Sequence, residues 1–154
     1  GNLAMTPLRL ISSIATLANN GKEYRPYIAK SIVDERSNIA QLNIKKKVLD
    51  YSKLEPIIYE VKKGLRDAVS KPYGTARWLA DLPFKASGKT GSAQFANNTK
   101  TNAFFVGYAP SDNPEIAIIV LIENAREGSI NTLPIAKDTL WWYYMNRIAS
   151  KKNE

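Results

Sequence analysis

The segment Ser87–Gln94 gathers the side chains of this chain that are best suited to hold an anionic ligand. Lys89 can supply a positive field, and the hydroxyls of Thr90 and Ser92 can donate hydrogen bonds to a carboxylate. Gly91 omits a side chain where a ligand would lie against the backbone, so that the next amide can point at a developing oxyanion. These residue types predict an accessible strand that binds an anionic substrate.

Two other interpretations of this segment have to be weighed. Gly88-Lys89-Thr90 matches the end of a phosphate-binding loop, but that loop needs a glycine at the position of Pro83. A nucleotide site of that kind is therefore excluded. A polar edge strand without a function stays open as an alternative, because three residues alone are a weak signal.

Two residue types are missing from the whole sequence, which contains no histidine and no cysteine. A Ser-His-Asp triad, a thiolate nucleophile, a disulfide framework and a zinc site built from these ligands are all excluded. We expect the chemistry to need neither a metal nor another cofactor.

The composition is that of a soluble globular chain of one domain, with 154 residues, 44% hydrophobic and 23% charged. The net charge of +8 falls mainly on residues 1–84, and its densest run is Lys45–Lys47. Such a run is usually a solvated face, but a basic interaction or nucleic-acid-binding module stays open as an alternative. We expect this stretch neither to span a membrane nor to carry a signal peptide, although a longer protein could.

The first half of the chain is expected to be mainly helical. Thr6-Pro7 is typical of a helix start and Gly21 of a helix end, which predicts a helix over Pro7–Asn20. Tyr24–Val33 is interpreted as extended. A second helix is expected near Ser52, where Ser-Lys-Leu-Glu matches a capping box. Four apolar residues would form its buried stripe: Ile58, Val61, Leu65 and Ala68.

The chain changes character after Pro72–Gly74, which should break the second helix. Three strands are predicted, and they cover Lys85–Phe95, Asn102–Ala109 and Glu115–Glu123. The short loops between them favour antiparallel hairpins. The unbroken apolar run Ile116–Ile122 predicts a central strand that is covered on both faces.

A final helix is predicted over Asn131–Ala149, with Pro134 in its first turn. Its apolar stripe would consist of Ala136, Leu140, Tyr144 and Ile148. Most of the aromatic run Trp141–Tyr144 is expected to pack in the core or at its rim. The elements together predict an α+β fold, in which an antiparallel sheet of at least three strands carries flanking helices and a packed C-terminal helix.

Segments on both sides of Lys89-Thr90-Gly91 resemble class B penicillin-binding proteins, whose third signature is Lys-Thr-Gly. The matching segments are, in chain order, Gly1–Leu8, Tyr73–Ala76, Asn102–Pro110, Glu123-Asn124, Gly128-Ser129 and Pro134–Ala136. Asn102 and Ala103 depart from the family's "HAWFVGFAP" strand. The resemblance covers nearly the whole chain, and Gln94 with Glu123-Asn124 makes it most similar to the elongation-type penicillin-binding protein 2.

The resemblance implies a serine acyltransferase fold that cross-links peptidoglycan. In this family a lysine-activated serine attacks the D-Ala-D-Ala peptide bond, and an amine of a neighbouring stem captures the acyl group; penicillins acylate the same serine. By matching positions, Lys89 would supply the positive field, Thr90 and Ser92 hydroxyls would hold the substrate carboxylate, and the Ser92 amide would be an oxyanion donor. The implied substrate-binding residues are Lys89, Thr90, Gly91, Ser92 and Gln94.

The nucleophile itself is absent, because no serine of the chain has a lysine three positions later. Ser111-Asp112-Asn113 spells the second signature, Ser-x-Asn, but it follows the third, so Ser111 is expected to be a turn residue. The chain therefore resembles the C-terminal part of a transpeptidase domain, with a mainly helical part over 1–84 and three strands plus a helix over 85–154. Alone it is predicted to be inactive.

Several further expectations come with the resemblance. The edge of the strand Glu115–Glu123 should be covered by another chain, a swapped copy or a missing part of the polypeptide. Implied partners are stem peptides, β-lactams, the rest of the domain, a cell-elongation glycosyltransferase and scaffold proteins, and no nucleic acid; the implied place is the periplasmic side of the bacterial inner membrane. A β-lactamase or D,D-carboxypeptidase of the same fold stays open, and the loop Ala96–Thr101 is expected to be mobile.

Overall fold

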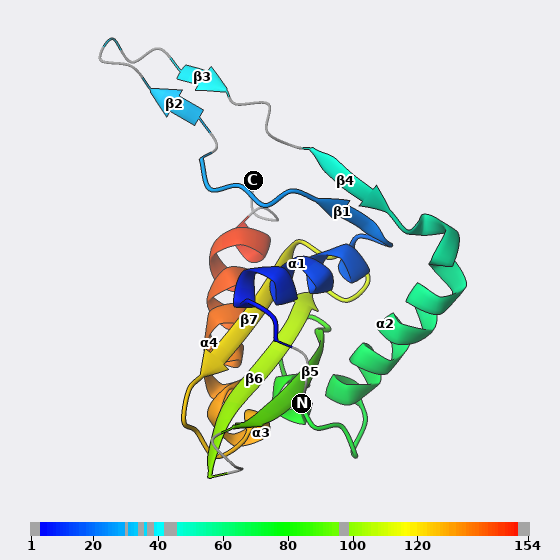
Figure 1. Cartoon of the computed structure of the whole chain (residues 1–154), viewed down its shortest axis with the longest axis vertical. Coiled ribbons are helices and arrows are strands. Elements are labelled where there is room, and N and C mark those ends of the chain that lie inside the picture. Colours follow the sequence, from blue (N-terminus) through cyan, green and yellow to red (C-terminus); the bar gives the residue numbers. More distant parts are fainter. Residues whose placement is uncertain are drawn as a thin grey trace.

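The computed structural model describes residues 4–29, 31–33, 36, 39–41, 46–95 and 99–150. Its centre is an antiparallel sheet of three strands, β5 (Ser87–Phe95), β6 (Lys100–Ala109) and β7 (Ile116–Ile122), in the order β5-β6-β7. Helix α1 (Pro7–Ala18) crosses one face of this sheet, and helix α4 (Leu133–Tyr143) covers the other (Figure 1). The predicted antiparallel hairpins are confirmed.

Alternation along the strands divides the apolar side chains between two cores. Phe105 on β6 and Val120 on β7 face α4 and pack with its buried Leu140. Tyr108 faces the other way and packs against Ile14 of α1. The sheet is therefore sandwiched between helices, as an α+β fold requires.

The unbroken apolar run predicted a central strand, and this prediction is wrong for the described part of the chain. There β7 pairs with β6 alone, and β6 is the middle strand. The physical reason is that helices cover both faces of β7, so that both faces carry apolar side chains. This burial does not depend on whether a second strand pairs with the edge of β7.

Helix α1 begins as predicted and ends two residues earlier than predicted. The Thr6 side chain accepts a hydrogen bond from the Arg9 amide at 3.2 Å, and Pro7 occupies the first turn. After α1, Asn20 and Gly21 both have positive φ, at 52° and 86°. Glycine is favoured at Gly21 because φ is positive there and because an added Cβ would lie 2.9 Å from the backbone carbonyl carbon of Tyr51.

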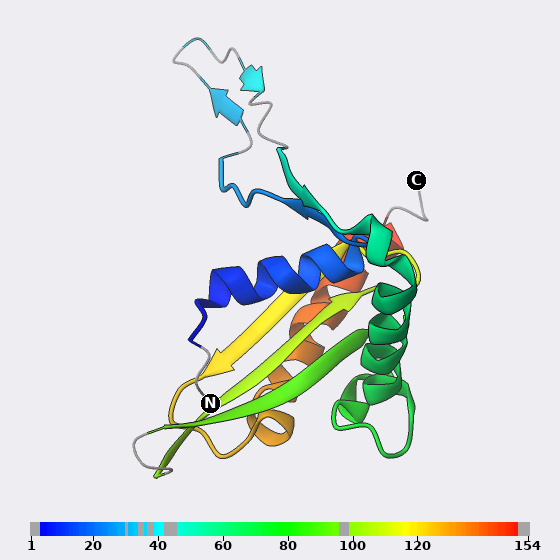
Figure 2. The ribbon, with the colours of Figure 1, turned by 45° about the vertical axis from the view of Figure 1, so that its right-hand side comes forward.

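The described residues of the range 22–50 form a projecting segment that we call the arm (Figures 1 and 2). At its base β1 (Lys22–Tyr24) pairs with β4 (Lys47–Asp50), and farther out β2 (Ser31–Val33) pairs with β3 (Ile39–Gln41). The predicted extended segment is thus split into β1 and β2. Lys45 of the basic run lies outside the described residues.

Helix α2 (Glu55–Ser70) follows a single 3₁₀ turn, η1 (Ser52–Leu54). The predicted capping box is wrong, because the Ser52 amide instead donates to Asp50 Oδ1 at 3.0 Å and Leu54 occupies the cap position without a side-chain bond. Of the predicted stripe, Ile58 is buried, Leu65 and Ala68 are half-buried and Val61 is exposed; Val69, which was not predicted, is buried. The helix ends before Pro72 as predicted, and η2 (Arg77–Leu79) follows.

The C-terminal part contains the short helix α3 (Gly128–Asn131), α4 and a final π-helical turn, η3 (Tyr144–Ala149). Tyr144 stacks on Phe84 with ring centroids 5.5 Å apart. The expectation for the aromatic run is wrong for Trp141 and Trp142, which are exposed because they face away from the sheet. Among the described residues, no helix is long and apolar enough to cross a membrane.

Candidate substrate-binding site

The predicted site residues lie on β5, an edge strand of the sheet. Thr90 is opposite Phe105 and Lys89 is opposite Val106 in the register of β5 and β6. Because Phe105 faces α4, Thr90 lies on that face of the sheet and Lys89 lies on the other. Two neighbouring side chains on opposite faces of a sheet can contact the same ligand only at the edge of the sheet. β5 is such an edge strand.

At this edge Lys89 and Thr90 meet at a third residue, Thr75, which follows α2. The Thr90 hydroxyl donates to Thr75 Oγ1 at 2.9 Å. Lys89 Nζ donates to the same oxygen at 3.4 Å and to the backbone oxygen of Thr90 at 2.9 Å. The edge of β5 therefore brings an ammonium group and two hydroxyls together at one point.

The position of Thr75 is fixed by the tight turn around Gly74. The Ala76 amide donates to the Ala68 carbonyl of α2 at 2.9 Å, and Ala76 is fully buried. A Cβ on Gly74 would lie 2.2 Å from the same Ala68 oxygen, so no other residue fits there without moving the helix end. Sequence reasoning noticed Tyr73–Ala76 only as a family turn and missed Thr75 as a site residue.

The two glycines of the signature region serve different purposes. A Cβ on Gly88 would lie 2.6 Å from Phe105 Cζ and from the Val106 carbonyl, so packing within the sheet requires this glycine. A Cβ on Gly91 would make only an ordinary contact, 3.6 Å from Phe104 Cβ. Nothing in the described fold demands glycine at position 91, which fits the predicted close approach of a ligand there.

Ser92 is held by the segment that follows β7. The Gly128 amide donates to Ser92 Oγ at 3.2 Å. A Cβ on Gly128 would lie 2.6 Å from the carbonyl oxygens of Gly91 and Phe104, so α3 begins directly on the sheet. Ser92 and Gln94 are exposed on the same face as Thr90. The oxyanion role of the Ser92 amide and the ligand contact of Gln94 stay predictions.

Ser111 lies in the β6–β7 turn, as expected. Its hydroxyl is 2.7 Å from the Ser87 hydroxyl, and its amide donates to the Lys85 carbonyl at 2.7 Å. The side chain is 8% exposed. It packs inside the protein and cannot serve as an accessible nucleophile.

Lys89 meets no carboxylate in the part of the chain that the structure describes. Among the described residues Lys89 is in no ion pair, whereas Lys137 pairs with Asp81 at 2.7 Å and Arg66 pairs with Asp112 at 2.8 Å. The same residues hold no cluster of side chains suited to a metal ion. The edge of β5 thus offers a positive charge and hydroxyl groups, which favours an anionic ligand.

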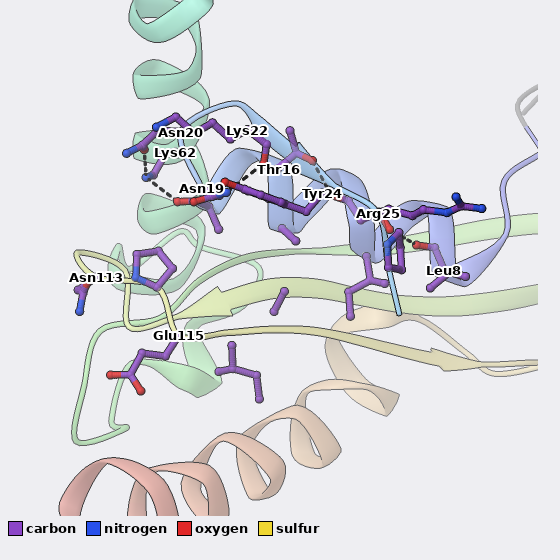
Figure 3. A pocket seen from close by; sticks show the side chains of 18 of the residues that line it. Leu8, Thr16, Asn19, Asn20, Lys22, Tyr24, Arg25, Lys62, Asn113 and Glu115 are labelled. Atoms are coloured by element: carbon purple, nitrogen blue, oxygen red, sulfur yellow. Dashed lines mark hydrogen bonds between the residues drawn. The ribbon is translucent and has the colours of Figure 1, made fainter. Parts of the chain in front are cut away.

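A groove of about 650 Å³ lies elsewhere, between α1, the base of the arm and the β6–β7 turn (Figure 3). Lys62 crosses one end, where it donates to Asn20 Oδ1 at 2.7 Å, and partial burial lowers the pKa of its ammonium group. Its lining contains none of the predicted site residues. Sequence reasoning missed this groove, because its walls come from segments far apart in the chain.

A family model described as "Penicillin binding protein transpeptidase domain" matches residues 1–140 of the chain. The chain belongs to this family. Transpeptidase-domain membership confirms the resemblance that was inferred from Lys89-Thr90-Gly91 and its flanking segments.

Curated relatives agree with this assignment. The chain is 30% identical to the peptidoglycan D,D-transpeptidase MrdA of Haemophilus influenzae, over 96% of this chain and 25% of the relative. It is 27% identical to MrdA of Acinetobacter baumannii, over 99% of this chain and 24% of the relative. The chain therefore spans about a quarter of the length of these relatives, and the expected likeness to elongation-type proteins is confirmed.

Solved structures confirm the fold. The penicillin-binding protein PBP2 of Pseudomonas aeruginosa, in complex with WCK 5153, is similar with a TM-score of 0.73 and 27% identity, over 96% of this chain and 31% of that chain. The imipenem acyl-enzyme of penicillin-binding protein A from M. tuberculosis has a TM-score of 0.77 at 22% identity, over 91% of this chain and 31% of that chain, and supports the fold alone.

Proposed function

We propose that this chain is the substrate-binding part of a peptidoglycan D,D-transpeptidase. One observation carries the proposal: Lys89 and Thr90, from opposite faces of β5, meet at an exposed edge where no carboxylate of the described residues neutralises the lysine. The names of the MrdA relatives supply the reaction. Bacterial relatives of this kind support a place on the periplasmic side of the inner membrane.

The proposed chemistry is acyl transfer in two steps. A serine hydroxyl, supplied by another part of the protein and activated by a lysine, attacks the carbonyl of the D-Ala-D-Ala bond, and the terminal D-alanine leaves with the proton. The amine of a second stem then attacks the acyl-enzyme and frees the serine. The Ser92 amide would donate to the oxyanion, a type of contact whose loss generally costs about 2.7 to 4 kcal/mol in the transition state.

The same proposal states which part of the transpeptidase domain this chain forms. Residues 1–154 form the C-terminal portion of one transpeptidase domain, and earlier strands of that domain cover the outer edge of β7. That edge carries backbone donors and acceptors along an apolar strand, which supports a partner strand there. The implied partners in the cell are stem peptides, a cell-elongation glycosyltransferase and scaffold proteins.

Labelling with a fluorescent penicillin tests the function. The full-length protein is incubated with the probe and separated by denaturing electrophoresis, and we expect a covalent band that unlabelled penicillin suppresses. A Lys89→Ala variant should be labelled much more slowly, whereas Lys85→Ala, a matched change outside the signature, should keep the rate. An unlabelled full-length protein would refute the proposal.

The fate of a donor stem peptide separates this function from its relatives. A transpeptidase joins the acyl group to the amine of a second stem, whereas a D,D-carboxypeptidase releases the trimmed stem and a β-lactamase rapidly hydrolyses the penicillin label. We expect the joined product in mass spectra. Residues 1–154 alone should stay unlabelled, and a covalent band on them would contradict the assignment of the nucleophile to another segment.

A further inference from the structure

The loop that joins β7 to α3, residues 123–127, carries an inference that rests on the proposed function and deepens it. This loop leads into Gly128, whose amide donates to Ser92 Oγ at 3.2 Å. A backbone amide is a donor only, so the direction of this bond is fixed and the Ser92 proton stays available for a ligand. The placement of the Gly128 amide therefore influences how Ser92 meets the substrate carboxylate.

The direction of the Gly128 N–H depends on the residue before it. The N–H of one residue and the C=O of the preceding residue lie in one rigid peptide plane and, in a trans peptide, point in opposite directions. A contact that fixes the Glu127 carbonyl therefore also fixes the Gly128 amide. Gly128 itself is buried against the sheet, where an added Cβ would lie 2.6 Å from the carbonyl oxygens of Gly91 and Phe104.

Asn131 holds both peptide planes that flank Glu127. Its backbone amide donates to the Glu127 carbonyl at 3.1 Å. Its side-chain oxygen, Oδ1, accepts from the Glu127 amide at 3.1 Å and from the Arg126 amide at 3.0 Å. One half-buried side chain thus satisfies two successive backbone donors of the loop.

The other end of the loop is tied to β6. The Asn124 amide donates to Asn102 Oδ1 at 3.2 Å, and the Ala125 amide donates to the Thr101 carbonyl at 2.8 Å. With these bonds, every backbone amide from Asn124 to Gly128 has an acceptor. The loop is therefore fixed at both ends, and such preorganisation avoids an ordering cost when a ligand binds.

We infer that Asn131 is a positioning residue for the substrate carboxylate. It fixes the peptide planes of Glu127, and these planes aim the Gly128 amide at Ser92 Oγ. The Gly128 amide also polarises the Ser92 hydroxyl, because hydrogen bonds in a chain strengthen one another, and this hydroxyl donates to the carboxylate. Asn131 acts only through the loop, so the loss of its side chain should cost less than the loss of the Ser92 hydroxyl.

The test measures how fast a fluorescent penicillin acylates the full-length protein. Ser92→Ala removes the direct donor and should lower the acylation rate constant by roughly 10- to 100-fold, the range for a hydrogen bond to a charged group. Asn131→Ala removes the acceptor of two loop amides and should lower it by roughly 3- to 10-fold, the range for a neutral hydrogen bond. Asn19→Ala is the matched control and should keep the rate, because the Asn19 side chain bonds to the backbone at the end of α1.

A double variant separates positioning from a general structural effect. If Asn131 acts through Ser92, Asn131→Ala should change the rate constant by less than about twofold once Ser92 is already alanine. An equal loss in the wild-type and Ser92→Ala backgrounds would show that Asn131 only supports the fold, and would overturn the inference.

Two more outcomes keep the inferences apart. A wild-type protein that the probe does not label refutes the proposed function, whereas a labelled wild type with an unaffected Asn131→Ala refutes only the role of Asn131. Asn131→Ser replaces Asn131→Ala if that variant does not fold, and the same double variant decides.

Discussion

The three-stranded sheet and the arm use similar apolar residues in opposite ways. In the sheet, β6 buries Ala103, Phe105, Tyr108 and Ala109 between α1 and α4, whereas every residue of β4 in the arm is exposed. The arm extends from the body of the protein, and its base is set by the positive φ of Gly21 and by the pairing of β1 with β4 (Figure 2). Two-stranded ladders of this kind add little stability without a third layer. The candidate site lies on the sheet, the region with the larger buried core.

The largest contrast should come from deleting one apolar side chain in each region. Phe105→Ala removes a fully buried ring from the core beneath α4 and should lower the free energy of unfolding by about 3 to 5 kcal/mol. Ile32→Ala on β2, where the side chain is 58% exposed, should change it by no more than about 0.5 kcal/mol. Urea unfolding of both variants measures the difference. Equal effects would show that the arm belongs to the core.

Two glycines of β5 should separate stability from binding. Gly88→Ala places a Cβ 2.6 Å from the Val106 carbonyl and should destabilise the fold by about 1 to 3 kcal/mol. Gly91→Ala has room for its methyl group, so its free energy of unfolding should lie within about 0.5 kcal/mol of the wild-type value. The same methyl group should slow penicillin labelling of the full-length protein. A destabilised Gly91→Ala with normal labelling would contradict both assignments.

A third glycine tests whether an exposed glycine can be replaced by alanine without loss of stability. Gly64 lies within α2, where an added Cβ would meet nothing within 4 Å. Gly64→Ala should raise the free energy of unfolding by about 0.5 to 1 kcal/mol, because alanine loses less conformational entropy in a helix. The midpoint of thermal unfolding should rise, and a fall would reveal a contact that α2 makes with another part of the protein.

The smallest effect should come from an ion pair in each region. Hydrogen bonding to Lys137 lowers the pKa of Asp81 in the body, and hydrogen bonding to Lys47 lowers the pKa of Asp50 in the arm. A lowered carboxyl pKa stabilises the folded state above the unfolded value, near pH 4, and this contribution is lost as the pH falls through the folded value. Asp81→Asn should therefore weaken the loss of thermal stability on acidification. Asp50→Asn should weaken it in the same direction, because hydrogen bonds from Lys47 and from Ser52 hold the pKa of Asp50 below its usual value.

Local signals were enough to predict the elements that surround the site. Lys89 and Thr90 are neighbours in the chain, and the strands that carry and flank them are marked by apolar runs and turn residues within a few positions. The helix start at Thr6-Pro7 is equally local, and the structure confirms its cap. Such features depend on side chains that are close in sequence.

Features that depend on distant contacts could not be predicted in the same way. Thr75 joins the site only because the end of α2 lies beside β5, and the sequence pattern of neither segment reports this packing. The edge position of β7 was hidden, because hydrophobic periodicity reports which faces are covered and not how many strands are paired. Ser52 does not cap α2 because Ser52–Leu54 first form a 3₁₀ turn, and the Ser52 amide, which Glu55 would accept from in a capping box, donates to Asp50 instead.

The open edge of β7 has a practical consequence for handling the chain by itself. Copies of residues 1–154 should associate through this edge at high concentration, since seven mostly apolar residues present backbone groups there. The same edge makes the domain a candidate for fragment complementation. Two separately produced halves would recombine at β7, and the return of penicillin labelling on mixing would report their reassembly.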